Sequence, residues 1–408
     1  MTDVGIERMG LYCGAAFVDV AKLAAVRGLD PARFANLLMR RKSVAFRFED
    51  PVSFAVNAAR PMIDALSPAE RSMIDLLVVA TESGIDWGKS ISNYAHRYLE
   101  LPRHCRMFEV KQACYGGTAA LRTAASLVAA GEARRALVIS TDVARCVPHS
   151  YAEPSQGCAA VALLVGRNPV VLALEAGASG VHGYEVMDSC RPTAETETGD
   201  VDLSLLSYLD CIERSFLAYR DRVGAVDFRD HFAYLACHTP FGGMVKGAHR
   251  TMMRKFSPGP PQAVNEDFER RVRPALAYCQ EVGNIYSGTV FLALAGALAH
   301  GDYTQPQRIG LFSYGSGCCS EFYSGMATAA SSQSVRALDL DGMLAGRREL
   351  DMTEYDALLA DEAQPLFGLA DVRIDAGRFT SVLDSHFAGT GRLVLDGVVG
   401  YQRQYRWA

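Results

Sequence analysis

The sequence predicts an α/β fold made of two related halves. In each half, near-continuous apolar runs alternate with helical segments rich in small residues, an order typical of a largely parallel sheet covered by helices. The second half repeats the first at similar distances, since 156 residues separate Glu82 from His238 and 170 separate Cys114 from Asn284. We therefore expect a duplicated fold whose halves are related by a pseudo-twofold axis.

The first half, residues 1–170, contains the segments that this pattern needs. An apolar run over 75–80 predicts a buried strand that leads into Glu82. A short alternating run ends at Cys114, and a helix is expected directly after it, over 116–130. Further strands are expected over 10–16, 136–142 and 159–165, and helices should begin near Asp19 and Asp30.

The second half, residues 171–408, follows the same plan after a segment that we interpret as an insertion, about 171–230. A strand then ends at His238, and a turn over 282–288 opens an alanine-rich helix that ends near residue 300. The other elements expected in this half are a helix over 205–219, a strand over 308–317, a helix over 349–361 and strand-like residues over 392–405.

Composition excludes several classes of protein. The 408 residues are 49% hydrophobic and 21% charged, as in ordinary globular proteins, and the net charge of −5 disfavours nucleic-acid binding. No apolar run has membrane-spanning length, and the N-terminus lacks the pattern of a signal peptide. The 11 scattered cysteines include no Cys-x-x-Cys pair, which disfavours a disulfide framework or a zinc site. We expect a cytoplasmic protein without a metal site.

Cys114 is the first candidate for chemistry. A position between a strand and the N-terminus of a helix favours a thiolate, because the helix dipole and free backbone N–H groups stabilise negative charge. Gly116 and Gly117 let a substrate approach the backbone closely. The alternative is a buried cysteine at a tight turn, since free cysteines are commonly buried.

Four polar residues, Glu82, Cys114, His238 and Asn284, end strands or open helices at corresponding positions of the two halves. Because ligands bind beyond the carboxyl ends of strands in such sheets, the pseudo-twofold axis would bring these side chains together. A thiolate suits acyl transfer, and a carboxylate with a raised pKa suits proton transfer near neutrality. Each also has a structural alternative: a carboxylate at a helix N-terminus, a capping histidine or a turn asparagine.

Six ordered motifs resemble those of the thiolase superfamily and, within it, of hydroxymethylglutaryl-CoA synthases. They are Thr-Glu-Ser-Gly at 81–84, Gln-Ala-Cys-Tyr-Gly-Gly-Thr at 112–118, Glu-Pro-Ser-Gln-Gly at 153–157, His-Thr-Pro-Phe-Gly-Gly-Met at 238–244, Gly-Asn-Ile-Tyr-Ser at 283–287 and Ser-Tyr-Gly-Ser-Gly at 313–317. The resemblance covers about residues 5–330. It implies a thiolase-like fold of αβαβα layers and a homodimer.

The resemblance also implies a role for each candidate residue. Cys114 would be acetylated, and Glu82 would remove a proton from the acetyl methyl group. The resulting carbanion would add to the β-ketone of an acceptor thioester that His238 orients and polarises. The substrate-binding residues implied are Asn284, Tyr286 and Ser316, the last in a loop that lends a backbone N–H to an oxyanion hole.

Two departures favour the synthases of polyketide β-branching cassettes. Residue 146 is a cysteine where primary-metabolism synthases carry a tyrosine, and 188–193 read Asp-Ser-Cys-Arg-Pro-Thr where they carry Phe-Trp-Arg-Pro. β-Branching synthases move acetyl from a donor acyl carrier protein to a β-ketoacyl group on an acceptor carrier protein. We therefore expect phosphopantetheine thioesters as substrates and no tightly bound cofactor.

Other functions stay open at this point. The main alternative is a primary-metabolism synthase that condenses acetyl-CoA with acetoacetyl-CoA. A decarboxylating ketoacyl synthase is disfavoured because it needs no glutamate base. An inactive scaffold that only binds carrier proteins is disfavoured by the presence of Glu82, Cys114 and His238 together.

Lys246, Arg250 and Arg254 follow the histidine motif at intervals of four, so they share one face of a predicted helix. That face could meet a phosphopantetheine phosphate and the acidic helix of a carrier protein. A solvated basic face is an equally good interpretation. Lys246 is the best candidate for substrate binding of the three because it lies nearest to the motif.

Overall fold

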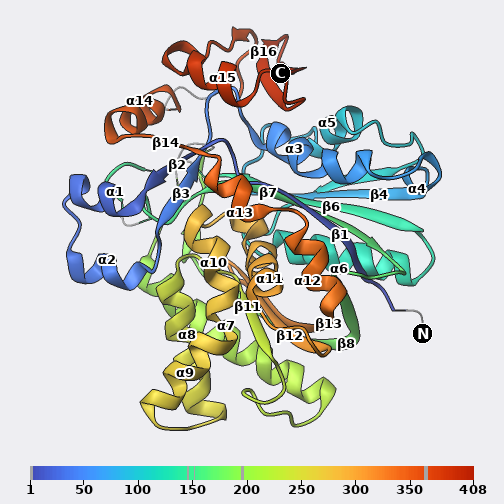
Figure 1. Ribbon diagram of the computed structural model, residues 1–408, viewed down its shortest axis with the longest axis vertical. Coiled ribbons are helices and arrows are strands. Elements are labelled where there is room, and N and C mark those ends of the chain that lie inside the picture. The colour runs from blue at the N-terminus through green and yellow to red at the C-terminus, as the bar shows by residue number, and fades with distance from the viewer. Residues whose placement is uncertain (1–2, 145–146, 151, 194–196, 363–365) are drawn as a thin grey trace.

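The computed structural model describes residues 3–144, 147–150, 152–193, 197–362 and 366–408. Its centre is a nine-stranded sheet in the order β11-β12-β13-β8-β1-β7-β6-β4-β5 (Figure 1). Neighbouring strands on one side come from the first half of the chain, and those on the other side from the second. The bounds are β1 Gly5–Tyr12, β4 Ile74–Ala80, β5 Arg106–Val110, β6 Arg135–Val143, β7 Cys158–Gly166, β8 Leu172–Gly183, β11 Tyr234–Cys237, β12 Gln307–Gly315 and β13 Cys319–Ala327.

The two sides of the sheet repeat one pairing scheme. In the first half, β4 runs parallel to β6, and β6, β7 and β1 then pair antiparallel in turn. In the second half, β11 runs parallel to β12, and β12, β13 and β8 pair antiparallel in the same way. The repeats meet where β1 pairs antiparallel with β8. The expected duplication of the fold is confirmed.

Helices cover the sheet in layers. α6 (Gly116–Ala129) and α11 (Thr289–His300), one from each half, share the central core with strands of both halves. α3 (Pro51–Asp64) packs on the other face of the first half, and α7 (Val201–Val223) on that of the second. From Thr289 to Ala299 every residue of α11 is buried, as expected for a helix enclosed between layers. The layers follow the predicted αβαβα order.

Two expectations about strands are wrong in the same way. The first strand was expected over 10–16, but β1 begins at Gly5. The segment 171–230 was expected to be an insertion, but it begins with β8, which is an integral strand of the sheet. Both strands contain charged residues that interrupt the apolar run by which a buried strand is recognised in a sequence. Glu7 pairs with Arg135 at 2.8 Å, and Glu175 pairs with Arg308 at 2.8 Å. These cross-strand ion pairs occupy corresponding places in the two halves.

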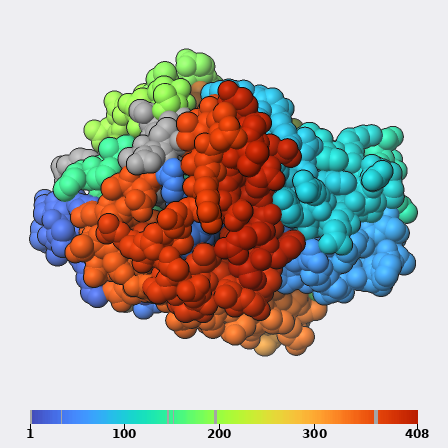
Figure 2. Space-filling view, turned by 90° about the horizontal axis from the view of Figure 1, so that it is seen from above, coloured from blue at the N-terminus to red at the C-terminus, as the bar shows by residue number. Residues whose placement is uncertain are grey.

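The C-terminal part forms a cap beside the first half. Figure 2 shows these residues, in orange and red, covering much of one face of the molecule. Their core contains Phe46, Phe379 and Val394, so it joins the N-terminal loop region to the last strands. The helix expected over 349–361 and the strands expected over 392–405 are present as α14 (Met352–Glu362), β16 (Leu393–Val399) and β17 (Gln402–Trp407).

The remaining elements connect these layers. Asp19 and Asp30 cap α1 and α2 with their side chains, as predicted. Within the described residues, no helix has the length and apolar character needed to cross a membrane. The other bounds are β2 Ala16–Asp19, α1 Val20–Arg27, α2 Pro31–Leu37, β3 Arg41–Val44, α4 Pro68–Arg71, α5 Ile91–Tyr98, β9 Ser189–Cys190, β10 Thr198–Gly199, α8 Gly242–Phe256, α9 Pro261–Arg271, α10 Arg273–Val282, η1 Tyr286–Gly288, α12 Ala329–Arg336, α13 Leu340–Ala345, β14 Arg348–Glu349, β15 Val372–Arg373, η2 Gly377–Phe379 and α15 Thr380–His386.

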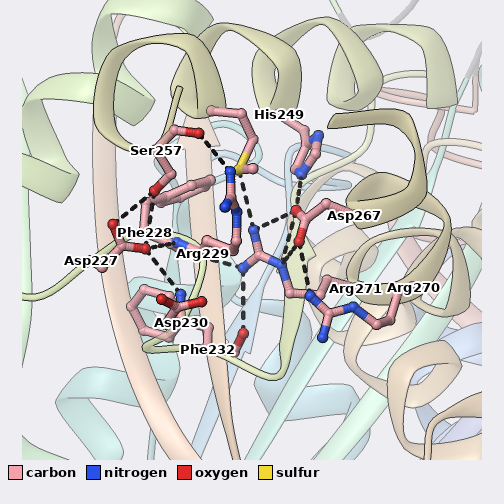
Figure 3. A network of polar contacts seen from close by, with 11 residues as sticks. Asp227, Phe228, Arg229, Asp230, Phe232, His249, Ser257, Asp267, Arg270 and Arg271 are labelled. Carbon is pink, nitrogen blue, oxygen red and sulfur yellow. Dashed lines mark hydrogen bonds and ion pairs between the residues drawn. The ribbon is translucent and has the colours of Figure 1, made fainter. Parts of the chain in front are cut away.

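A buried ionic network fixes α9 against α8 (Figure 3). Asp267 on α9 accepts hydrogen bonds from Arg271 at 2.6 and 2.8 Å, and its carboxylate lies 2.7 Å from Nε2 of His249 on α8. Arg271 also donates to the carbonyls of Phe228 and Phe232, in the loop before β11. Burial alone would raise the pKa of Asp267, but the hydrogen bonds from His249 and Arg271 hold it well below its usual value. The network ties both helices to the loop that precedes His238.

Candidate active site

The carboxyl ends of the strands open into one large pocket. Its volume is about 1810 Å³, against about 300–1,000 Å³ for typical small-molecule sites. The structure brings the predicted residues of both halves together in its lining, which includes Glu82, Cys114, His238, Asn284, Tyr286 and Ser316. A pocket of this size has room for two extended substrates.

Cys114 lies at a tight turn between β5 and α6. Ala113, directly before it, has φ of 44°, a left-handed conformation that is unfavourable for a residue with a Cβ atom. The turn packs against Gly315 at the end of β12, where an added Cβ would lie 2.6 Å from the carbonyl oxygen of Gln112. The glycine of the Ser-Tyr-Gly-Ser-Gly motif is therefore required for the loop of one half to support the cysteine of the other.

The thiol of Cys114 donates a hydrogen bond to Oε1 of Glu82 at 3.0 Å. Burial, together with the Glu82 carboxylate, raises the pKa of this thiol well above its usual value. The expectation of a resting thiolate is therefore wrong, because burial and the adjacent carboxylate outweigh the helix N-terminus. The hydrogen bond places the Glu82 carboxylate where it can accept the thiol proton.

The environment of Glu82 suits a proton acceptor near neutrality. Glu82 is half-buried and lines the pocket, and its pKa is raised to about 7, chiefly by burial. The negative charge of Asp142 contributes to this rise, and the positive charge of Arg191 opposes it. A carboxyl group with this pKa exchanges protons readily in either direction at neutral pH.

Asp142, at the end of β6, holds the two halves of the site together. Its Oδ1 accepts hydrogen bonds from the backbone N–H of Glu82 at 2.8 Å and from the hydroxyl of Thr81 at 3.0 Å. Its Oδ2 accepts hydrogen bonds from the N–H and hydroxyl of Ser287, at 3.1 and 2.5 Å. One buried carboxylate thus fixes the Glu82 loop to the Asn-Ile-Tyr-Ser turn of the second half.

His238 projects from the end of β11 as a neutral imidazole. It is 2% exposed, and burial lowers its pKa to about 3. Its backbone N–H donates to the carbonyl of Phe312 at 2.7 Å, and its own carbonyl accepts a hydrogen bond from Tyr208 at 2.7 Å. Among the described residues, Nδ1 has no hydrogen-bond partner. The ring can polarise a carbonyl group by donating a hydrogen bond, without becoming a cation.

Asn284 and Ser316 contribute donors from two other loops. The side-chain oxygen of Asn284 accepts hydrogen bonds from the N–H of Tyr286 at 3.0 Å and from Thr289 at 2.8 Å, so its NH₂ group is the part left to face a substrate. Beside Ser316, the N–H of Gly317 already donates to Asp188 at 2.8 Å. The NH₂ group of Asn284 therefore suits the stabilisation of a thioester oxyanion, whereas the Gly317 N–H is already engaged.

Comparison with known families shows which family the chain belongs to. Residues 1–170 match the N-terminal domain of hydroxymethylglutaryl-coenzyme A synthases, and residues 258–367 match the C-terminal domain. The chain belongs to the hydroxymethylglutaryl-CoA synthase family. It is therefore a carbon–carbon bond-forming enzyme that transfers an acyl group.

This synthase is more similar to synthases of polyketide pathways than to a hydroxymethylglutaryl-CoA synthase. It is 49% identical to the polyketide biosynthesis 3-hydroxy-3-methylglutaryl-ACP synthase PksG of Bacillus subtilis, over 100% of both chains. The curacin-pathway HMG synthase solved with acetyl donor-ACP superposes with a TM-score of 0.97 at 50% identity over 100% of both chains. The hydroxymethylglutaryl-CoA synthase of Enterococcus faecalis is 33% identical, over 88% of this chain and 92% of its own.

The basic residues predicted on α8 of the synthase lie outside the pocket lining. Arg250 and Arg254 are exposed on the helix surface. The ammonium group of Lys246 lies 5.5 Å from the ring centroid of Phe268 on α9. The structure therefore gives Lys246 a packing partner away from the reacting groups.

Sequence reasoning about the synthase missed Asp142 and Arg191 as parts of the site. Asp142 was recognisable as an acidic residue at the end of an otherwise apolar strand, β6. Arg191 was noted only as part of a motif that separates subfamilies. Its contact with the Glu82 loop depends on where the residues after β9 lie relative to the pocket, which periodicity does not reveal. Cys146, used in the same subfamily argument, lies outside the described residues.

Proposed function

We infer that this synthase performs polyketide β-branching. It adds an acetyl group to the β-ketone of a carrier-bound β-ketoacyl chain to give a 3-hydroxy-3-carboxymethyl product. The observation that carries this inference is sequence identity. It is 49–50% over the full chain to the ACP synthase PksG and to the curacin-pathway synthase, against 25–33% to the hydroxymethylglutaryl-CoA synthases of other organisms and to synthases solved with CoA ligands. The Cys114–Glu82 hydrogen bond gives the inference a chemical basis.

We propose that Cys114 and Glu82 perform the first step together. Glu82 takes the thiol proton as sulfur attacks the acetyl thioester, and then gives that proton to the departing phosphopantetheine thiolate. The hydrogen bond of 3.0 Å supports this direct transfer. One C–S bond forms, one breaks, and Glu82 is again a carboxylate.

In the second step, Glu82 removes a proton from the methyl group of acetyl-Cys114. The carbanion attacks the β-ketone carbon of the acceptor, and His238 hydrogen-bonds to the ketone oxygen as negative charge develops there. The resulting alkoxide takes up the proton that Glu82 removed, which gives the hydroxyl group and returns Glu82 to its carboxylate form. The neutral state of His238 supports this role, because a neutral ring can still donate a hydrogen bond to the ketone oxygen. Water then hydrolyses the Cys114 thioester and leaves a carboxylate on the product.

The residues around this chemistry would hold the thioesters. Asn284, Tyr286 and Ser316 line the pocket, and the amide groups of the Asn284 and Ser316 loops suit an acceptor thioester and its oxyanion. Arg250 and Arg254 present positive charge on α8 for the acidic surfaces of the donor and acceptor acyl carrier proteins. Lys246 stays a weaker candidate for the phosphopantetheine phosphate, since it lies over Phe268. The chemistry itself uses only side chains and thioester substrates.

We further propose a cytoplasmic homodimer. β5 is an edge strand of the sheet, and Met107 and Phe108 on it line the pocket, so a second copy placed against this edge would complete the pocket wall. The ten cysteines among the described residues are all free thiols, which supports a reducing compartment. Size-exclusion chromatography with light scattering tests the dimer.

Kinetics with matched substrates test the proposed function. Acetyl-carrier protein and β-ketoacyl-carrier protein should give a much larger kcat/KM than acetyl-CoA and acetoacetyl-CoA, because contacts with the carrier surface position the reacting ends. The product should appear on the acceptor carrier protein in intact-mass spectra. Equal efficiency with the CoA forms would favour the primary-metabolism alternative.

A further inference from the structure

Arg191 and Glu197 form an ion pair beside the reacting groups. Arg191 directly follows β9 and Glu197 directly precedes β10, and these two strands pair antiparallel. Nη2 of Arg191 lies 3.0 Å from Oε2 of Glu197, and Nη1 donates to the backbone carbonyl of Glu82 at 3.3 Å. The Arg191 side chain is 16% exposed, so this cation is largely withdrawn from water.

Glu197 gathers donors from three parts of the chain. Its Oε2 accepts hydrogen bonds from Arg191, from the hydroxyl of Tyr286 at 2.9 Å and from Nε2 of Gln156 at 3.0 Å. The guanidinium of Arg191 also lies 5.1 Å from the ring centroid of Tyr286. The ion pair therefore links the Glu82 loop to the Tyr286 turn, in addition to the link through Asp142.

The charges around Glu82 are unbalanced without Arg191. From β6 and from the segment before β10, Asp142 and Glu197 each place a negative charge near Glu82, and the Cys114 thiol donates to it from the α6 turn. Arg191 is the cation whose charge lowers the pKa of Glu82 against these groups and against burial. The pair thus links the two loops, and its Arg191 member places a positive charge near Glu82.

We propose that Arg191, held by Glu197, is a positioning residue for Glu82 that fixes its loop and keeps it ionised for methyl-proton abstraction. This inference rests on the proposed role of Glu82 as the base. Arg191 acts through Glu82 and does not touch the reacting atoms.

The two members of the pair should shift the pH dependence in opposite directions. Glu82 works when deprotonated, so activity falls as pH drops through its pKa. Arg191→Met removes the stabilising charge, so the acid limb of kcat/KM should move to higher pH by about one unit, with recovery at high pH. Glu197→Gln removes an opposing charge, so the limb should move to lower pH. Loss of structure alone would lower activity at every pH for both variants.

The experiment measures pH profiles of kcat/KM for condensation and of deuterium exchange into the methyl group of acetyl-enzyme without acceptor. Arg191→Lys should keep the limb near that of the wild type. Arg191→Gln replaces Arg191→Met if the latter does not fold. Arg308→Met is the matched control, since it breaks the Arg308–Glu175 pair at the far end of β12 and should leave the limb in place.

The outcomes separate this inference from the proposed function. Opposite shifts for the Arg191 and Glu197 variants support the inference. Unchanged limbs, or shifts in the same direction, overturn it. Glu82→Gln is measured in parallel: if methyl exchange persists in that variant, the assignment of Glu82 as the base is wrong, whatever the Arg191 variants show.

Discussion

Cys114 and Glu82 share one proton in the resting site. The thiol keeps the proton because burial and the nearby carboxylate both raise its pKa, while Glu82, with a pKa of about 7, is ready to accept it. An uncharged thiol reacts more slowly with oxidants than a thiolate does. In the proposed mechanism, the thiol loses its proton to Glu82 only as it attacks the substrate carbonyl group. The protonation state of this pair is thus part of its selectivity.

Cys114→Ser should abolish acetyl loading. A serine hydroxyl can occupy the same turn and donate to Glu82, but its alkoxide is far harder to form than a thiolate at neutral pH. Intact-protein mass spectrometry after incubation with acetylated carrier protein measures the adduct. An adduct on another cysteine in the wild-type enzyme would remove Cys114 from this role.

Glu82→Gln should separate the two chemical steps. Attack by the thiol should slow but continue, because water can accept the thiol proton. Abstraction of a methyl proton needs a positioned base, so carbon–carbon bond formation should fall by about 10²–10⁴-fold. Rapid-quench measurement of acetyl-enzyme and of product on the acceptor distinguishes the steps, and normal condensation would place the base elsewhere.

At the scale of elements, the sequence predicts best where one physical rule acts alone. β4, β6 and β7 are buried on both faces, so their continuous apolar runs identify them directly. β1 and β8 carry Glu7 and Glu175, which are tolerated because each pairs with an arginine on another strand. Such compensation depends on three-dimensional neighbours, so periodicity alone does not detect it.

The same limit applies to the site. Residues that end strands in the two halves were predictable, since duplication places Glu82, Cys114, His238 and Asn284 at corresponding positions. Arg191 was not predictable in this way, because its contact with the Glu82 turn depends on where a loop of the second half lies. The error about the thiolate has the same origin, as the helix N-terminus is visible in the sequence and the carboxylate 3.0 Å away is not.

The α8–α9 unit should depend on Arg271 for stability. Its side chain is 1% exposed, and Arg271→Met would leave the buried Asp267 carboxylate without its main cationic partner. Breaking a buried pair in this way costs about 3–5 kcal/mol. Arg273→Met is a close control, because the Arg273–Glu269 pair is 35% and 52% exposed and its loss should cost less than about 1 kcal/mol. Equal denaturation midpoints for both variants would contradict this account of Figure 3.

For the whole molecule, duplication places one reacting group set on each half and the substrates between them. In the proposed mechanism, the first half supplies the acetyl-bearing cysteine and its base, and the second supplies His238 and Asn284 for the acceptor. Hydrogen bonds of Asp142 and of the Arg191–Glu197 pair link the Glu82 loop to the second half. A donor and an acceptor thioester can therefore be bound by different halves and still meet at one carbon–carbon bond.

Recognition of the carrier proteins should act at the surface, apart from this chemistry. Reversing charge in the double variant Arg250→Glu with Arg254→Glu should lower kcat/KM for carrier-bound substrates by about tenfold or more at low ionic strength, because steering by surface charge acts on association. The loss should shrink as salt is added. CoA thioesters lack the protein surface, so their kcat/KM should stay near that of the wild type. Arg406→Glu, an exposed charge reversal on β17, serves as the control and should change neither reaction. A loss that is equal for carrier and CoA substrates, or independent of salt, would show that α8 is not the carrier-binding face.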